Sequence, residues 1–533
     1  MRLGVDFGTT RIVVATADRG NYPLVTFDAP DGQTQEWFPP LVAVGEEGRL
    51  FGWDAWRVQG DPKWTVIRSI KRFLKLAGPT TELETGRGTY PLQELVTELL
   101  LSLRRRLRKN STLQLDRGEP LEVMIGVPAN ANSNQRFLTA EAFRAAGFHV
   151  LGMLNEPSAA SFEFGHRDRA ARKDEPGRSL LVYDLGGGTF DASLVEMEET
   201  IHTVVATVGI PDVGGDDFDE VLAEIALETA DIGDADRAKL SPAEWFQLCE
   251  ECRERKESLN PNTRKIAIDL ERVRAGWGEV SIAAGTFYER CRPLIQRTEA
   301  VVEGLLAQYG DHALETLYVT GGGSELPAVS RILKENFGRR VVRSAYMRSA
   351  TAIGLAIAAD DRANYLLKDR LARYFGVWRE ADYGQNVSFD LLFPRGLELP
   401  RPGAVPVRTA RAYNPAHNIG HFRYAECTSI GANGQPAGDL MVWDDIRFPF
   451  DPALRDSPDL SLVPISKSRS MDGQAVEEEY TCDASGMVKV TITNQSAGYR
   501  REYSLGRWSG KMPRVTAAPP SKRDWSQRHR ETR

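Results

Sequence analysis

At 533 residues the chain is too long for one hydrophobic core, so a single-domain protein is excluded and about two to four folding units are expected. Apolar residues make up 41% and charged residues 26%, which excludes a disordered chain and predicts a soluble globular protein. The net charge of −7 provides no general attraction for nucleic acid, and no uncharged apolar stretch reaches the roughly 18 residues of a membrane helix. Five scattered cysteines and the absence of a leader-like start favour the cytoplasm, with neither nucleic acid nor membrane as a partner.

From the N-terminus to about Asp361, short β-branched runs alternate with long amphipathic stretches. The runs at 3–8, 121–128, 179–188 and 316–323 predict strands, and the stretches at 92–109, 134–148 and 244–259 predict helices. This alternation is typical of an α/β domain. A final stretch, ANYLLKDRLARYFGVW at 363–378, is interpreted as one more helix.

From about Val377 the pattern changes to short alternating segments separated by Pro, Gly and Asn, which predicts an all-β, sandwich-like module. The last stretch combines Pro with dense basic charge and has no apolar period, so it is interpreted as a disordered tail. The expected organisation is therefore an α/β domain at 1–361, an interdomain segment at 362–376, a β-rich module at 377–512 and a basic tail at 513–533.

Two metal-like patterns are interpreted as structural. Cys249 and Cys252 have CxxC spacing within a predicted helix, but no second ligand pair follows them. His417 and His421 lie near Cys427 in a predicted β-hairpin, again with no further pair at suitable spacing. We therefore expect no structural metal at either place.

Three glycine-rich turns each follow a predicted strand, at 6–10, 184–189 and 321–324. Glycines in such turns let backbone N–H groups converge on phosphate oxygens. The first two turns both open with an aspartate and close with threonine, so they form a matched pair that could hold a polyphosphate from opposite sides. Asp6 and Asp184 would then face a magnesium ion, which is commonly shared between carboxylates and nucleotide phosphates and keeps its waters.

Several motifs, in this order along the chain, resemble those of one known protein family. LGVDFGTT at 3–10 resembles the first phosphate loop of Hsp70 (DnaK-type) proteins, LVYDLGGGTFDASLVE at 181–196 resembles the second, and LYVTGGGSELPAV at 317–329 resembles the adenosine loop. VGGDDFD at 213–219 is similar to a further family element. The resemblance implies the actin-like Hsp70 ATPase fold with duplicated ribonuclease-H-like lobes, ATP or ADP with Mg²⁺ as ligands, and slow hydrolysis of ATP.

The resemblance also assigns individual residues. VIRSIKRFLK at 66–75 is similar to the segment that carries the family's catalytic lysine, which places Lys71 at the site, while Pro128, Arg136 and Glu156 fall where the family relays its nucleotide state. The resemblance implies, for catalysis, Lys71, Asp184, Thr189, Asp191 and Glu156; for nucleotide binding, Asp6, Gly8, Thr9, Thr10, Gly186, Gly187, Gly188, Gly214, Gly215, Lys256, Gly321, Gly322, Gly323 and Ser324; and for magnesium, Asp6 and Asp184 through water.

Some positions depart from the family pattern. Glu257 and Glu325 replace the arginines that commonly sandwich adenine, Arg253 stands where a glutamate is usual, and Asn260 stands where a serine is usual. Losing the stacking arginines is expected to weaken adenine affinity, because cation–π contacts contribute on the order of 0.5–2 kcal/mol each. The family's acidic-aliphatic linker is replaced by the stretch at 364–378, and its helical lid has no counterpart, so the chain is identified as a lid-less, divergent member.

The leading hypothesis from the sequence is an ATP-dependent chaperone-like protein that couples its nucleotide state to an unfolded or extended polypeptide, with a co-chaperone and a nucleotide-exchange factor as possible partners. A metabolite kinase of the same ATPase superfamily is the first alternative, although the sequence has no recognisable substrate-binding acid/base set for it. A nucleotide-dependent scaffold or filament protein is the second, and it would leave the β module without a role.

Overall fold

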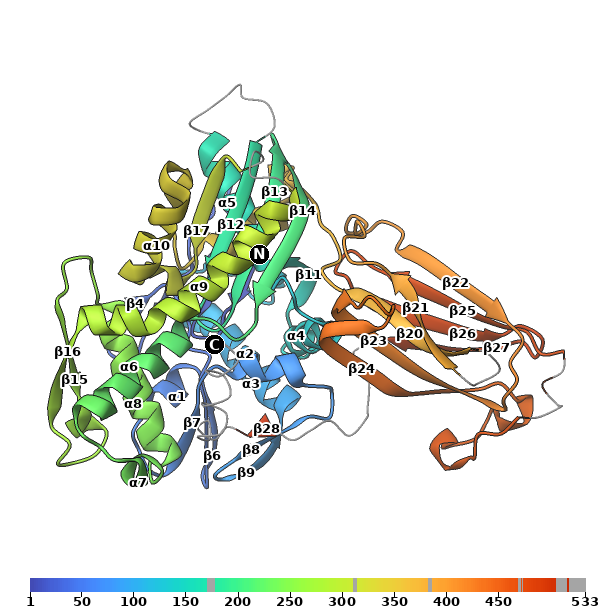
Figure 1. Cartoon of the computed structure of the whole chain (residues 1–533), viewed down its shortest axis with the longest axis horizontal. Helices are drawn as coiled ribbons and strands as arrows, with labels where there is room; N and C mark the ends of the chain where they lie inside the picture. The colour runs from blue at the N-terminus through green and yellow to red at the C-terminus, as the bar shows by residue number, and fades with distance from the viewer. Residues whose placement is uncertain are drawn as a thin grey trace.

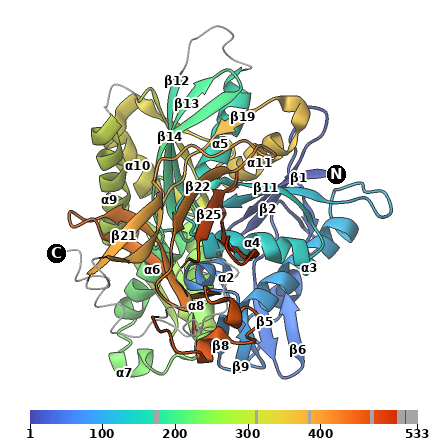
Figure 2. The same cartoon turned by 90° about the vertical axis from the view of Figure 1, so that its right-hand side faces the viewer.

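The computed structural model describes residues 1–169, 178–309, 314–381, 386–467, 471, 473–504 and 515–516. An α/β body lies on one side and an all-β module on the other (Figure 1). Figure 2 looks onto the β module, with the α/β body behind it. Within the described residues, no helix is long and apolar enough to cross a membrane.

The first lobe of the α/β body is built on a four-stranded sheet in the order β11-β10-β1-β2. Strands β1 and β2 form an antiparallel hairpin, and β10 and β11 continue the sheet in parallel to β1. Apolar residues are buried on both faces because helices α3 and α4 cover one and α5 and α11 the other. The bounds are β1 Arg2–Phe7, β2 Ile12–Thr16, β10 Glu122–Val127, β11 His149–Asn155, α3 Leu92–Lys109, α4 Ser133–Ala145, α5 Glu156–Arg169 and α11 Ala350–Ala359.

The second lobe repeats this plan in a sheet of order β18-β17-β12-β13-β14-β19. Strands β12 and β13 form the antiparallel hairpin, and β17 and β18 extend the sheet in parallel. The repeated hairpin-plus-parallel plan confirms the expected Hsp70-type ATPase fold with duplicated lobes. The bounds are β12 Arg178–Leu185, β13 Phe190–Glu198, β14 Ile201–Ile210, β15 Lys265–Asp269, β16 Glu279–Ala283, β17 Thr316–Thr320, β18 Val341–Arg343, α6 Gly215–Thr229, α7 Asp234–Arg237, α8 Pro242–Glu257, α9 Ala284–Tyr309 and α10 Pro327–Phe337.

Helices α5 and α11 pack between the two lobes with almost no side chain separating them. A Cβ atom added at Gly354 of α11 would lie 1.8 Å from the carbonyl oxygen of Ala159 in α5. Only glycine allows two helices to approach this closely, so Gly354 fixes the spacing of the elements beneath the cleft.

A small subdomain inserted into the first lobe carries Lys71. It contains the three-stranded sheet β6-β5-β7, the hairpins β3–β4 and β8–β9, and two short helices. Its elements are β3 Phe27–Asp28, β4 Thr34–Gln35, β5 Val42–Gly45, β6 Gly48–Phe51, β7 Trp64–Ile67, β8 Glu82–Thr85, β9 Gly88–Pro91, α1 Trp53–Arg57 and α2 Ile70–Phe73.

The helix predicted at 363–378 is wrong. Asn364 has a left-handed backbone (φ 56°), which ends helical geometry after Asp361–Ala363. Strand β19 (Leu366–Lys368) then pairs in parallel with the edge of β14, and β20 begins at Tyr374, inside the interval expected to separate the domains. The open edge of β14 supplies backbone partners that a helix prediction based on local pattern does not see.

The C-terminal module is a sandwich of two four-stranded sheets, as the sequence predicted. One sheet has the order β21-β20-β23-β24 and the other β22-β25-β26-β27. Their facing side chains form one core that includes Phe375 and Tyr424 from the first sheet and Tyr480 and Val490 from the second. The bounds are β20 Tyr374–Ala381, β21 Asn386–Phe393, β22 Val407–Tyr413, β23 Ile419–Ile430, β24 Pro436–Pro449, β25 Val476–Cys482, β26 Val488–Asn494 and β27 Tyr499–Ser504.

Helix α4 of the first lobe contacts the β module directly. The backbone N–H and the hydroxyl of Ser133 both donate to the carboxylate of Glu426 on β23, the backbone bond being 3.0 Å long. Arg136, one turn further along α4, donates to the carbonyl oxygen of Ser485 at 3.1 Å. The sandwich is therefore held against the first lobe by polar contacts at the start of α4.

The tail expected to be disordered lies largely outside the described residues. Two of its residues, Val515–Thr516, form strand β28, which pairs in parallel with β8 of the inserted subdomain. At these two positions the expectation of disorder is wrong.

Candidate functional site

The matched glycine-rich turns face each other across the two lobes. They lie where β1 turns into β2 and where β12 turns into β13. A Cβ atom added at Gly187 would come within 2.7 Å of the Thr10 hydroxyl oxygen, and one added at Gly188 within 2.8 Å of the Thr9 hydroxyl oxygen. Glycine is therefore required for the two turns to meet, and their N–H groups and hydroxyls converge on one small space.

The third turn completes the same space from the second lobe. Gly321 has a left-handed φ of 87°, and a Cβ atom there would lie 2.3 Å from the carbonyl oxygen of Leu185. The turn at 321–323 is thereby held against the end of β12, beside Asp184.

Four carboxylates and one lysine lie at the bottom of this cleft: Glu156, Asp184, Asp191 and Lys71 are buried, and Asp6 is partly buried. Lys71 is 6% exposed, and its Nζ atom donates to Glu156 Oε1 at 2.5 Å. Burial, and then the charge of Glu156, raise the pKa of Asp6 and the pKa of Asp191, each to about 7. Burial raises the pKa of Asp184 well above its ordinary range, and the neighbouring carboxylates raise it further.

The excess of negative charge in this group fits a bound cation. Lys71 forms an ion pair with Glu156 and neutralises its charge. Among the groups that most affect the pKa values of Asp6, Asp184 and Asp191, Lys71 is the one cationic side chain. Carboxylate oxygens beside phosphate-binding turns are the ligands that Mg²⁺ prefers. Asp6 and Asp184 would hold the ion directly or through its waters.

The short helix α2 brings Lys71 into the cleft. Ser69 has a left-handed backbone (φ 56°), and its hydroxyl donates to Asp216 Oδ2 at 2.5 Å. A left-handed non-glycine residue is uncommon and needs such external support. The contact between Ser69 and Asp216 thus fixes the start of α2, from which Lys71 points to Glu156.

Arginines from the inserted subdomain bind acidic residues at the start of α6 in the second lobe. Arg68 lies 3.2 Å from Asp216 and 3.3 Å from Asp219, and Arg72 lies 2.7 Å from Asp217. These ion pairs bridge the two lobes on the side of the cleft near Lys71.

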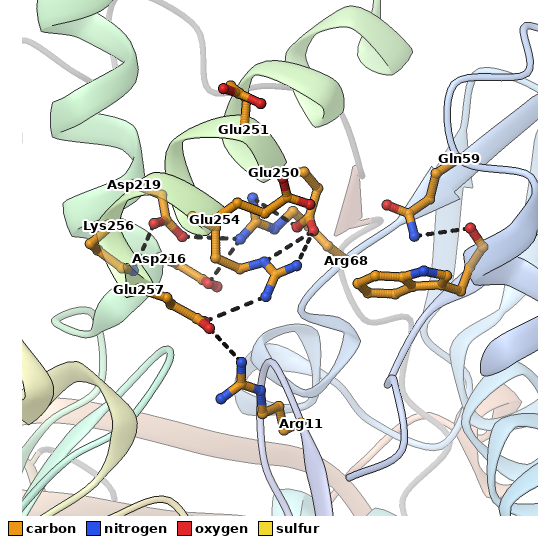
Figure 3. A network of polar contacts seen from close by, with 12 residues as sticks. Arg11, Gln59, Arg68, Asp216, Asp219, Glu250, Glu251, Glu254, Lys256 and Glu257 are labelled. Carbon is orange, nitrogen blue, oxygen red and sulfur yellow. Dashed lines mark hydrogen bonds and ion pairs between the residues drawn. The ribbon is translucent and has the colours of Figure 1, made fainter. Parts of the chain in front are cut away.

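A second set of charges closes the cleft where the base of a nucleotide would lie. The Glu257 carboxylate at the end of α8 forms ion pairs with Arg11 of the first lobe and with Arg348, with nitrogen–oxygen distances of 2.5 Å and 3.2 Å. Arg348 also forms an ion pair with Glu325. Figure 3 shows Arg11 reaching from below to Glu257. The two glutamates that replace the family's arginines are therefore paired with arginines supplied by other elements.

Lys256 lies beside this second set. Its Nζ atom donates to the carbonyl oxygen of Gly215 and pairs with Asp219, both at 2.6 Å, as Figure 3 shows for the ion pair. The lysine thus joins α8 to α6 along the wall of the cleft.

Most of the residues predicted from the sequence line one cavity of about 90 Å³. Of the predicted set, those lining it are Asp6, Gly8, Thr9, Thr10, Lys71, Glu156, Asp184, Gly186, Gly187, Thr189, Gly215, Lys256, Gly321, Gly322 and Gly323. Ordinary ligand pockets have roughly 300 Å³ or more. Admission of a whole nucleotide therefore requires the lobes, and the ion pairs that join them, to move apart.

Four predicted residues lie beside this cavity and do not line it. Gly188 and Gly214 contribute to the backbone behind it, and the Ser324 hydroxyl donates to the carbonyl oxygen of Thr320 at 2.8 Å. Asp191 faces a neighbouring cavity, and its Oδ1 atom accepts the Ala129 N–H at 3.0 Å.

Among the cavity residues that sequence reasoning did not assign to the site are two arginines, Arg11 and Arg348. Arg11 directly follows Thr10 of the first phosphate loop, so its position was a usable signal. Arg348 has no such signal, because its carboxylate partners Glu325 and Glu257 are 23 and 91 residues away in the chain.

One expected relay residue connects the cleft to the β module. Arg136 is buried and donates to Asn155 Oδ1 at 2.7 Å, in addition to Ser485 of the sandwich. Asn155 directly precedes Glu156, the partner of Lys71. Asn155 also donates to Asp369 at 2.9 Å, just after β19, so three parts of the chain meet at this amide.

These features define a two-lobed nucleotide-binding domain of the actin-like kind joined to a β-sandwich. The sequence model of the family described as "Hsp70 protein" matches residues 2–364, and the chain belongs to the Hsp70 family. It is 31% identical over 524 residues to the chaperone protein HscA of Klebsiella pneumoniae (strain 342) and 32% identical over 527 residues to that of Cronobacter sakazakii. Each of these matches covers 93% of this chain and 76% of the relative.

A third relative is matched over a shorter length. The chaperone protein HscA homolog of Tolumonas auensis is 30% identical over 379 residues, which is 67% of this chain and 57% of that protein. The chain therefore spans little more than half of this relative.

Proposed function

We propose that the chain is an ATP-dependent chaperone of the Hsp70 type, which binds and slowly hydrolyses ATP with Mg²⁺ and couples this cycle to the binding of an extended polypeptide. The observation that carries the proposal is the buried Lys71–Glu156 pair between two matched phosphate turns, in a chain that continues into a docked β-sandwich. The relatives named as chaperones support the same function.

In this proposal the cleft works mainly by positioning and charge. The N–H groups of the turns and the hydroxyls of Thr9, Thr10 and Thr189 would hold the phosphates. Asp6 and Asp184 would hold Mg²⁺, which would supply charge neutralisation for the phosphates. Lys71 would stabilise the γ-phosphate and orient the attacking water, as expected for phosphoryl transfer that depends on positioning.

Asp191 is suited to orient that water. Its carboxylate accepts hydrogen bonds from the Ala129 N–H and the Thr189 hydroxyl, and because an ionised carboxylate has about four acceptor sites, it can also accept one from water. The water oxygen would form the new bond to the γ-phosphorus, while the bond to the β–γ bridging oxygen breaks. The bridging oxygen would leave with the electron pair on ADP, giving inorganic phosphate and one proton.

The outer face of one sandwich sheet offers a surface for an apolar polypeptide. The register places Leu391, Gly376, Ala425 and Val442 in one row across the sheet β21-β20-β23-β24. Leu391 and Val442 are 39% and 38% exposed, and Val387 and Leu440 extend the same face with 60% and 42% exposure. Exposed apolar side chains gathered on one face of a sheet commonly mark a binding surface.

Two routes support coupling between the cleft and this module. Arg136 joins Asn155, next to Glu156, to Ser485 of the sandwich. Strand β19 joins the sheet edge of the second lobe directly to β20. A change in the cleft that shifts Glu156 or β14 would therefore reach the polypeptide surface through short polar contacts.

The test uses the full-length protein, a fluorescent extended apolar peptide and Mg-ATP. We expect peptide binding in the micromolar range or weaker, weaker binding on addition of ATP, and phosphate release that the peptide stimulates. Val442→Ser should weaken peptide binding, whereas Leu462→Ser, which removes an 81% exposed leucine outside this sheet, should not. Stimulation of turnover by a sugar or glycerol, with no effect of peptide, would favour a metabolite kinase instead.

A further inference from the structure

A second cavity, of about 270 Å³, lies between the catalytic residues and the β module. It shares Thr9, Lys71 and Thr189 with the nucleotide cleft, so the two spaces meet at these side chains. Asp191, proposed to orient the attacking water, faces only the second cavity of the two. The γ-phosphate of a nucleotide would therefore lie at the junction of the two cavities.

The lining of this second cavity favours an anion. Its cationic side chains are Lys71, Arg72, Lys75 and Arg395, against two acidic ones, Asp191 and Asp439. Asp439 is paired with Arg373 at 3.1 Å, which reduces its effect on the cavity.

In the part of the chain that the structure describes, two of the lining cations have no carboxylate partner. Lys75 Nζ has no ion pair and no hydrogen-bond acceptor among the described residues. Among the same residues, Arg395 donates only to carbonyl oxygens, that of Thr207 at 2.8 Å and that of Thr428 at 3.4 Å. Both side chains therefore retain charge and donors for a ligand that enters the cavity.

We propose that this cavity holds the inorganic phosphate produced by hydrolysis before it leaves the protein. The proposal rests on the proposed ATPase function and names the path of one product. A tetrahedral anion with several waters fits a space of this size, because one water occupies about 30 Å³ in the liquid. Phosphate released at Lys71 and Thr189 moves toward Lys75, away from ADP, which stays in the cleft on the other side.

The β module forms one wall of this chamber. Arg395, Thr428 and Asp439 belong to the sandwich, and the Arg395 guanidinium reaches the end of β14 in the second lobe. The chamber is consequently complete only while the sandwich is docked. Release of phosphate then depends on the contact between the two modules and not on opening of the nucleotide cleft.

The binding test titrates inorganic phosphate into the full-length protein loaded with Mg-ADP and follows the phosphorus NMR signal of free phosphate. Lys75→Met keeps the side-chain length and removes the charge, and it should weaken phosphate binding about tenfold, the loss expected for one charge-assisted contact. Lys63→Met, at an exposed lysine outside the chamber, is the matched control and should bind phosphate like the wild type.

The kinetic test compares ATP cleavage, measured by acid quench, with phosphate release, measured with a fluorescent phosphate sensor, in a single turnover. We expect release to lag behind cleavage in the wild type and the lag to shorten in Lys75→Met and in Arg395→Gln. The titration reports on phosphate from the medium, and the lag reports on phosphate made at the site.

The two experiments test the phosphate chamber and the proposed ATPase function separately. Equal phosphate affinity and equal lag in Lys75→Met and Lys63→Met would overturn the phosphate chamber, whether or not the protein hydrolyses ATP. Absence of ATP cleavage by the wild type would overturn the proposed function, while the titration with Mg-ADP would still decide whether the chamber binds phosphate.

Discussion

Glu257 is expected to control how fast nucleotide leaves the cleft. Its carboxylate receives Arg11 across the gap between the lobes, and it also pairs with Arg253 of its own helix and with Arg348. Replacing Glu257 by Gln removes the charge and keeps the side-chain shape. The interlobe contact is then lost, and the closed arrangement of the lobes is weakened.

The size of the effect follows from the electrostatics of this carboxylate. Burial alone raises the pKa of Glu257, but Arg11, Arg253, Arg348 and Lys256 together lower it from 4.5 to about 2. The net shift corresponds to about 3 kcal/mol, to which four cationic side chains contribute and Arg11 contributes most. Only Arg11 crosses between the lobes, so its share is about 1 kcal/mol, or roughly a fivefold change in the opening equilibrium.

The assay is stopped-flow release of a fluorescent ADP analogue from the full-length protein. Glu257→Gln should release it about five times faster than the wild type. Glu254→Gln is the matched control, because Glu254 lies on the same helix but is half exposed, and among the described residues its one ion pair is with Arg272, at 3.4 Å. Release at the wild-type rate in Glu257→Gln, or equal acceleration in both variants, would refute the role of the Arg11–Glu257 contact.

Three further predictions concern catalysis, metal binding and stability. Lys71→Ala should retain nucleotide binding but slow single-turnover hydrolysis by about 100-fold or more, since it removes the buried cation nearest the expected γ-phosphate; unchanged turnover would exclude the lysine from catalysis. Asp184→Asn should weaken ATP binding in a magnesium titration as well as slow hydrolysis, and an unaltered magnesium dependence would mean that this aspartate only supports the turn. Burial lowers the pKa of His202 from 6.5 to about 3, so the folded protein keeps this ring neutral while the unfolded chain binds a proton below pH 6.5. This contribution to stability is complete above pH 6.5 and is lost as the pH falls toward 3. At pH 5 the loss of free energy of unfolding is about 2 kcal/mol. Urea unfolding at pH 7 and pH 5 should therefore show a smaller pH effect in His202→Asn than in the wild type, and equal pH effects would contradict it.

The sequence predicted the lobes and the phosphate turns because their signals are local. Each turn needs glycine at a close approach, to the Thr10 side chain at Gly187 and to the Leu185 carbonyl oxygen at Gly321, and each follows a strand of buried apolar residues. Lys71 was different, because only the family resemblance distinguished it from an ordinary helix lysine. Its burial beside Glu156 supports the assignment on physical grounds that the local sequence does not contain.

The failed helix prediction has a nonlocal cause. The stretch at 363–378 has helical periodicity, but its leucines meet the open edge of β14, more than 150 residues earlier in the chain. The weakened adenine affinity expected from the loss of the family's two arginines stays a prediction. What the sequence did not predict is that Arg11 and Arg348 pair with Glu257 from other elements.

The pairing of β19 with β14 also determines how the connection between the modules responds to a pulling force. Only three residue pairs, Ile201 with Leu366, His202 with Leu367 and Thr203 with Lys368, hold this strand to the sheet. Parallel pairing is slightly weaker per residue than antiparallel pairing, and the neighbouring ladder between β13 and β14 is much longer. A pulling force between the two modules would therefore peel off β19 while the sheet of the second lobe stays intact. Tension on a bound polypeptide would thus be felt first at the start of β14, at the opposite end of this strand from Gly209 beside Asp191, before either module unfolds.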